Sequence, residues 1–109
     1  MGASKTDFFT QDQVELAAVA KALGHPARIA IIQHLLKVNS CVCGDIVSEL
    51  PLAQPTVSQH LKELKSAGLI KGSIEGNALC YCINEVTWNK YKEVLAALFG
   101  SYKTAVKCC

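Results

Sequence analysis

The sequence predicts a mainly α-helical domain that carries one small β-hairpin, an α+β fold class. Three observations lead to this prediction. Apolar residues recur at helical spacing in several segments, one later stretch changes to a strand pattern, and glycine, proline or asparagine stands at most boundaries. The 109 residues suffice for one domain with a modest core, and half of them are hydrophobic. We therefore expect residues 1–109 to form a single domain.

The first two helices are predicted on either side of a break at residues 24–26, Gly-His-Pro. A helix is expected over 12–23, where apolar residues recur every three or four positions. A second is expected over 27–37, because proline suits the first turn of a helix and the same spacing continues. This second helix is the expected centre of the core.

Two shorter helices are predicted next, over 41–50 and 54–67. Asn39 and Ser40 are suitable N-cap residues for the first, and Gly68 is suited to close the second. Two short helices joined by a tight turn form a helix-turn-helix unit. We place this unit at about 41–67.

Residues 69–83 are predicted to form a hairpin, with strands over 69–74 and 79–83 and a turn at 75–77. A final helix is expected over about 85–107. This order of elements is that of a winged helix-turn-helix, with the hairpin as the wing. The final helix is more apolar than one face of a small monomer needs, which favours a dimer over packing within one chain.

The helix over 54–67 is the candidate DNA-reading element. In a helix-turn-helix the second helix enters the major groove of double-stranded DNA, and its N-terminal residues reach base edges. Net charge is only +2, but residues 54–71 hold three lysines and a histidine against one acid. The contacts predicted near bases are Gln54, Thr56, Ser58 and Gln59, and those predicted on phosphates are His60, Lys62 and Lys65. A solvated polar helix face is the simpler interpretation, and the hairpin that follows directly favours DNA contact.

Six cysteines form three close pairs: Cys41 and Cys43, Cys80 and Cys82, and Cys108 and Cys109. Such density in an intracellular chain indicates metal or redox chemistry, because thiolates favour soft ions. Cys41 and Cys43 fall at a predicted helix start, where the helix dipole lowers a thiol pKa. Two residues apart on a helix, their side chains diverge by about 200°. One ion bound by both would therefore distort the first turn.

Other function classes are not favoured by the sequence. No apolar run is long enough for a membrane span, and the N-terminus lacks the pattern of a signal peptide. We therefore expect a cytoplasmic protein without a membrane partner. The chain has no phosphate loop, paired catalytic carboxylates or nucleophile–base pattern, so an enzyme is not expected.

Four stretches resemble the ArsR/SmtB family of bacterial metal-sensing repressors over about residues 16–83: LGHPARIAIIQHL, CVCGDIVSEL, LAQPTVSQHLKELKSAGLI and EGNALCYCIN. The resemblance implies a homodimer, joined through the first and last helices, on a pseudo-palindromic operator that is released when ligand binds. The cysteine-bearing stretch resembles that of arsenic and cadmium/lead sensors. It implies trivalent arsenic or antimony as regulatory effector, with cadmium or lead as the alternative, and no obligatory cofactor.

The sequence also departs from the family pattern. The third cysteine common in the arsenic motif is Ile46 here, so a third thiolate must come from elsewhere or two thiols suffice. Cys108 and Cys109 are candidates for it, and Cys80 and Cys82 are weaker ones. The wing tip at 75–77 carries an acid, and Ala53 replaces the usual N-cap serine or threonine.

The three histidines argue against one kind of metal sensor. The final helix has no histidine, which disfavours the zinc site that some family members build there, and His34 is expected to be structural. Two alternatives stay open for the cysteines. They could form a redox or persulfide switch on the same fold, or a thiol-rich metal buffer that uses the winged helix only as a scaffold.

Overall fold

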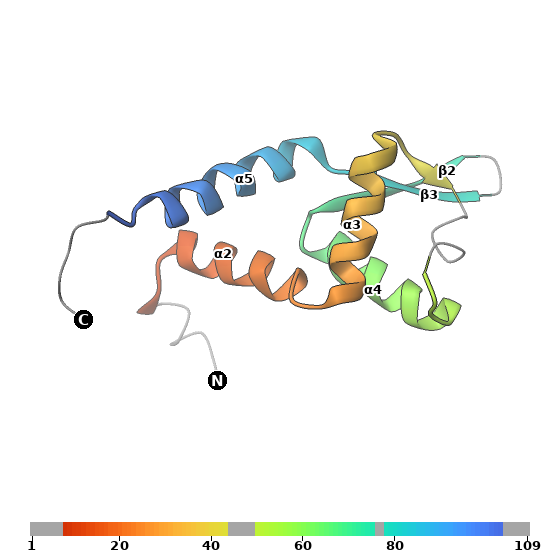
Figure 1. Cartoon of the computed structure of the whole chain (residues 1–109), viewed down its shortest axis with the longest axis horizontal. Coiled ribbons are helices and arrows are strands. Elements are labelled where there is room, and N and C mark those ends of the chain that lie inside the picture. Colours follow the sequence, from red (N-terminus) through yellow and green to blue (C-terminus); the bar gives the residue numbers. More distant parts are fainter. Residues whose placement is uncertain (1–7, 44–49, 76–77, 104–109) are drawn as a thin grey trace.

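The computed structural model describes residues 8–43, 50–75 and 78–103. It confirms the predicted mixture of helices and one hairpin (Figure 1). The elements, in chain order, are α2 (Gln11–Ala22), α3 (Pro26–Val38), β1 (Val42–Cys43), α4 (Gln54–Ser66), β2 (Ile70–Glu75), β3 (Ala78–Ile83) and α5 (Glu85–Gly100). In the described part of the chain, no helix is long and apolar enough to cross a membrane.

The boundaries of α2 and α3 follow from local capping chemistry. Thr10 and Gln13 form a capping box, in which the Thr10 hydroxyl accepts from the Gln13 N–H at 3.1 Å and the Gln13 side chain accepts from the Thr10 N–H. At the start of α3 the His25 ring accepts a hydrogen bond from the Ala27 N–H through Nδ1 at 3.0 Å. Asn39 ends α3 in the left-handed conformation, with φ of 57°. Our prediction that Asn39 caps the following helix was therefore wrong.

The segment after α3 differs most from its prediction. We expected a helix to begin at Cys41, and instead Val42 and Cys43 form strand β1, which pairs antiparallel with β3. The Val42 side chain is buried in the core cluster, so core packing and ladder hydrogen bonds together favour the strand. The rest of the predicted helix, 44–49, lies outside the described residues.

A three-stranded sheet results, with strand order β1-β3-β2. The hairpin register pairs Ile70 with Ile83 and Glu75 with Ala78. Gly68 joins α4 to this sheet with φ of +83°, as a C′ glycine should. The Leu69 N–H bonds to the Leu64 carbonyl and the Gly68 N–H to the Lys65 carbonyl, which is the double bond of a Schellman motif. α4 thus passes into the wing through a fixed turn.

The core lies where α2, α3, α4 and the sheet meet. Its fully buried members include Val19, Ile31, Leu35, Val57, Leu64, Leu69 and Ile70. No residue of α5 is buried in this chain, although α5 lies beside α2 at the end opposite the hairpin (Figure 1). The helix ends at Gly100, earlier than the predicted 107, and the Ser101 hydroxyl donates to the Leu98 carbonyl there.

Candidate DNA-binding face and thiol site

α4 presents one apolar face to the core and one polar face to solvent. The buried positions recur at helical spacing: Val57, His60, Leu61 and Leu64. All the other predicted DNA contacts on this helix are exposed: Gln54, Thr56, Ser58, Gln59, Lys62 and Lys65. Ala53 makes no side-chain capping bond, as expected from its methyl side chain. The exposed set forms the candidate DNA-binding face.

Two side chains of this face make contacts within the chain. The Gln59 amide donates to Glu63 at 3.0 Å, one turn along the helix. The Lys65 ammonium lies beside Gly72 of β2, since a Cβ built on Gly72 would be 3.5 Å from it. The positive charge of Lys65 therefore sits against the hairpin rather than at the N-terminal end of α4.

His60 is not part of the exposed face, which argues against the predicted phosphate contact. Its side chain is only 7% exposed. Its ring packs against that of His25, with the centroids 4.4 Å apart, and its Nδ1 accepts a hydrogen bond of 3.0 Å from Arg28 Nε. The physical reason is position, because His60 lies three residues after Val57 and so on the same helix face.

Arg28 connects three helices through this contact. Besides His60 of α4, its guanidinium donates to the carbonyls of Lys21 and Ala22 at the end of α2, at 3.5 and 3.3 Å. Burial lowers the pKa of His60, and the positive charges of His25 and Arg28 lower it further. A neutral His60 is the form that can accept from Arg28 at Nδ1. The recognition helix is thus held by a neutral imidazole.

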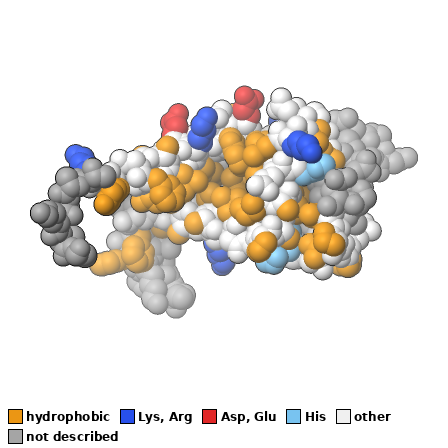
Figure 2. Space-filling model, viewed as in Figure 1, with side chains coloured by type: hydrophobic (Ala, Val, Ile, Leu, Met, Phe, Trp, Pro, Cys, Tyr) orange, Lys and Arg blue, Asp and Glu red, His pale blue; other side chains and the backbone are white. Residues whose placement is uncertain are grey.

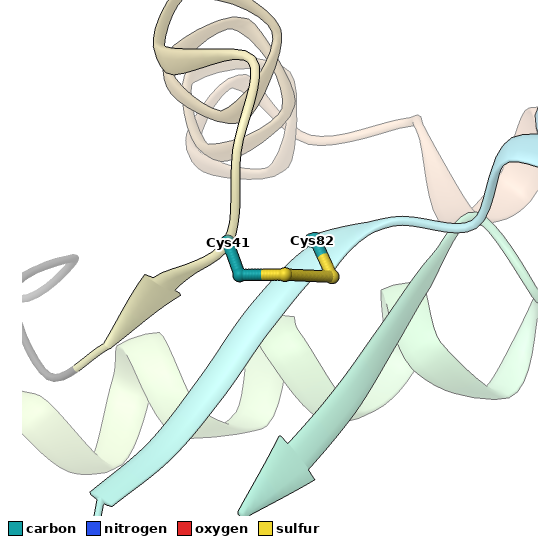
Figure 3. The surroundings of a disulfide bond; sticks show 2 residues. All are labelled: Cys41 and Cys82. Carbon is teal, nitrogen blue, oxygen red and sulfur yellow. A yellow bond between two sulfur atoms is a disulfide. The ribbon is translucent and has the colours of Figure 1, made fainter. Parts of the chain in front are cut away.

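Cys43 lies on strand β1 and Cys41 directly precedes it, so no helix begins at Cys41 and the predicted helix-dipole effect does not apply there. Cys41 forms a disulfide with Cys82 of β3, and the two Cα atoms are 4.3 Å apart (Figure 3). The two residues stand one position beyond the Val42–Tyr81 pair of the ladder, and their spacing is close to the value of about 4.5 Å for cross-strand pairs whose side chains lie closest. Alternation places residues two apart on the same side of a strand, in contrast to the divergence expected on a helix.

The other cysteine of each Cys-x-Cys stretch continues the same register. Cys43 lies opposite Cys80 in the β1–β3 ladder, and Cys80 is fully buried and also disulfide-bonded. The sequence did contain a signal for this arrangement. Two Cys-x-Cys stretches of equal spacing match each other in antiparallel pairing, whereas the prediction favoured Cys41 and Cys43 and treated Cys80 and Cys82 as weaker candidates. Cys108 and Cys109 lie outside the described residues.

A pocket of about 330 Å³ lies beside the disulfide, between the end of α3 and the adjoining strands. Cys41 and Cys82 form part of its wall, together with Lys71 and Ile83. Among the residues that the structure describes, no three His, Cys, Asp or Glu side chains converge on a common metal position. His34 is half-buried on α3.

A second feature is the apolar surface near the chain ends. Figure 2 shows hydrophobic side chains gathered over α2 and α5. The most exposed large ones in this region are Phe8, Phe9, Leu98, Phe99 and Tyr102. A mostly apolar pocket of about 400 Å³ also opens between the helices, lined by Val19 and Leu23 on one side and Trp88, Tyr91 and Leu95 on the other. Lys90 and Glu15 form an ion pair of 2.8 Å across the two helices.

Comparison with known proteins agrees with this geometry. The family model described as bacterial regulatory protein, arsR family, matches residues 25–71. An uncharacterised helix-turn-helix transcriptional regulator of Methanocaldococcus jannaschii is 42% identical over 76 residues, covering 69% of this chain and 73% of the relative. An arsenical resistance operon repressor of Staphylococcus xylosus is 33% identical over 70 residues, covering 64% of this chain and 66% of the relative. A homologue of the cadmium resistance regulatory protein CadC from Staphylococcus aureus is 32% identical over 83 residues, covering 75% of this chain and 68% of the relative.

Solved structures show the same fold. An ArsR-like transcriptional regulator from Rhodococcus sp. RHA1 superimposes with a TM-score of 0.71 at 23% identity, covering 84% of this chain and 85% of that one. Reduced HlyU from Vibrio cholerae gives a TM-score of 0.65 at 26% identity, covering 82% and 93%. These similarities are to transcriptional regulators and not to enzymes. The chain therefore belongs to the ArsR family of transcriptional regulators.

Proposed function

We propose that this regulator is a homodimeric repressor that binds operator DNA through α4 and releases it when an effector reacts with Cys41 and Cys82. The observation that carries the proposal is the sulfur pair itself. Cys41 stands directly before β1 and Cys82 lies on β3 of the wing, so a change at this pair acts on the segment between α3 and α4 and on the hairpin that follows α4. Thiophilic ions are the matching effector class, with trivalent arsenic or antimony first and cadmium or lead next.

The exposed apolar surface over α2 and α5 supports the dimer. Leu98, Phe99 and Tyr102 are each more than half exposed in the single chain, and hydrophobic surface of this kind is normally covered by a partner. A dimer also doubles the DNA sequence that is read, since one recognition helix contacts few base pairs. The names of the arsenical and cadmium resistance relatives support a soft-ion effector.

A redox switch at the same cysteines is the second candidate, and the Cys41–Cys82 disulfide is the observation that favours it. Here an oxidant would remove two electrons and two protons from the thiol pair, and a thiol reductant would return them. A solved structure of HlyU from Vibrio cholerae is described as the reduced form, so the oxidation state was specified for that similar protein.

The test is release of labelled DNA, measured by fluorescence anisotropy with the promoter region upstream of the protein's own gene. Reduced protein is titrated with arsenite, cadmium, zinc or a persulfide donor, and oxidised protein is measured separately. We expect release by at least one soft ion or by oxidation. If wild-type protein releases DNA neither with a soft ion nor on oxidation, thiol-controlled repression is refuted.

Cys41→Ser and Cys82→Ser should each keep DNA affinity and lose the response. The Cys108→Ser/Cys109→Ser variant is the matched control, because it makes the same chemical change away from the pair. A normal response in the first two variants and a lost response in the control would move the site to the chain end.

A further inference from the structure

The apolar pocket between α2 and α5 is built from both fixed and half-buried side chains, and it shares no lining residue with the pocket beside the disulfide. Val19 and Leu69 are fully buried parts of its lining. The α5 side of the pocket comes from one face of that helix, because its lining residues stand three, four and seven positions apart: Trp88, Tyr91, Lys92 and Leu95. Folding therefore leaves an apolar hollow beside α2 and α5, which lie next to each other (Figure 1).

One positive charge stands at this apolar pocket. Among the described residues that line it, Lys92 is the only charged one. Lys90, two positions earlier, is neutralised by Glu15 at 2.8 Å, whereas no carboxylate in the described part of the chain pairs with the exposed Lys92. Small-molecule sites typically combine an apolar lining with a few polar groups that fix the ligand's orientation. The matching ligand has an apolar body and one negative group.

The size of the pocket sets the size of the apolar body. Its volume is about 400 Å³, whereas an apolar cavity of roughly 150 Å³ already accommodates benzene, so a body of about ten carbons fits. A second copy of the chain is a less suitable occupant, because charged side chains such as Lys92 are depleted at the apolar centre of protein interfaces. The apolar surface assigned above to the dimer also uses other α5 residues, Leu98 and Phe99.

The pocket reaches the recognition helix through Leu69. The Leu69 N–H bonds to the Leu64 carbonyl of α4 at 3.1 Å, and the Leu69 carbonyl accepts from the Asn84 N–H at 3.0 Å. Asn84 is the N-cap of α5, where its side chain accepts from the Thr87 N–H. One lining residue is thus bonded both to the end of α4 and to the start of α5. A ligand held against Leu69 and α5 acts on how these two helices are placed.

We propose that this pocket is a second effector site, which binds a small amphiphilic carboxylate with its apolar chain between α2 and α5 and its carboxylate at Lys92. A ligand that binds the free and the DNA-bound forms unequally changes the affinity for DNA. Such control needs no sulfur chemistry, so it goes beyond the thiol response proposed above and operates beside it.

Binding can be measured directly, because Trp88 is the only tryptophan of the chain and lines the pocket. The full chain is titrated with decanoate, 1-decanol or decylammonium, below the concentrations at which they aggregate, and Trp88 fluorescence is followed. Decanoate should give a saturable change at one site per chain and should bind at least about threefold tighter than decylammonium. A change that does not saturate, or equal affinity for the two ions, would overturn the proposal.

Two pairs of variants separate the charge from the apolar lining. Lys92→Gln should weaken decanoate about two- to fivefold and leave 1-decanol unchanged, with Lys37→Gln as the control because Lys37 is exposed and lies outside the pocket. Leu95→Ala should weaken both ligands about three- to tenfold, with Val86→Ala as the control because Val86 is 82% exposed on the same helix and does not line the pocket. Circular dichroism checks that each variant folds. Equal effects of a variant and its control would contradict the assigned site.

Two further measurements test the effector role and the competing occupant. Decanoate should lower the affinity for promoter DNA at least about threefold, and Cys41→Ser/Cys82→Ser should keep this response. An unchanged DNA affinity at saturating decanoate would refute the effector role. Dissociation of a dimer by decanoate in sedimentation would show that a second copy covers the pocket, which would also overturn the proposal. If decanoate acts while no thiol reagent or oxidant does, the thiol mechanism fails and this site stands.

Discussion

Replacing His60 with alanine tests whether this residue supports the recognition helix or touches DNA. The ring is 7% exposed and accepts a 3.0 Å hydrogen bond from the charged Arg28 side chain. A hydrogen bond to a charged group contributes about 1.5–3 kcal/mol, and removing a buried ring leaves a cavity with a further cost. We therefore expect His60→Ala to lower the free energy of unfolding by about 2–4 kcal/mol.

The assay is urea unfolding followed by circular dichroism, together with DNA affinity measured across a salt series. Lys62→Ala is the matched control, since it changes an exposed residue of the same helix. It should alter stability by less than about 0.5 kcal/mol and reduce the salt slope by about 1. If His60→Ala instead leaves stability unchanged and reduces the salt slope, the buried role is refuted and a phosphate contact is favoured.

Three further predictions concern the titration of His60, the turn at Gly68 and the exposed surface of α5. The free energy of unfolding should fall as pH drops below 6.5, the ordinary pKa of histidine, because His60 binds a proton in the unfolded chain before it does so in the folded one, where its pKa is lowered. Urea unfolding at a series of pH values measures this fall. His60→Leu should make the free energy of unfolding less dependent on pH. Gly68→Ala should cost about 1–2 kcal/mol in thermal unfolding, because φ is +83° and the new Cβ would lie 3.1 Å from the Thr87 methyl; no loss would contradict the Schellman turn. Phe99→Glu should shift a dimer to monomer in sedimentation at micromolar concentration, whereas an unchanged mass would place the interface elsewhere.

The helices and the hairpin could be predicted because their signals are local. Pro26 marks the start of α3, Gly68 closes α4, and the apolar spacing of α4 reflects the face that it buries. The same spacing should have identified His60, since positions 57, 60, 61 and 64 share one face. The prediction of a phosphate contact for His60 relied on the charge that histidine can carry and not on its position along the helix.

The thiol site could not be predicted from local signals. β1 is two residues long, and its conformation depends on pairing with β3, which lies about 40 positions away in the chain. A helix start at Cys41 and a strand at Val42 are both compatible with the nearby residues. Burial of Val42 in the core and pairing with Tyr81 decide between them, and both are tertiary effects.

The Cys41–Cys82 bond also changes the topology of the polypeptide. With a sequence separation of 41, it closes a covalent ring that contains all of α4 and the hairpin as far as Cys82, while α2, α3 and α5 remain outside it. Closing a ring of this size restricts the unfolded chain and is worth about 4 kcal/mol in the loop-entropy model. The DNA-reading half of the oxidised protein should therefore resist unfolding and proteolysis more than that of the reduced protein. The lifetime of the regulator in the cell would then depend on its thiol state independently of any change in its affinity for DNA.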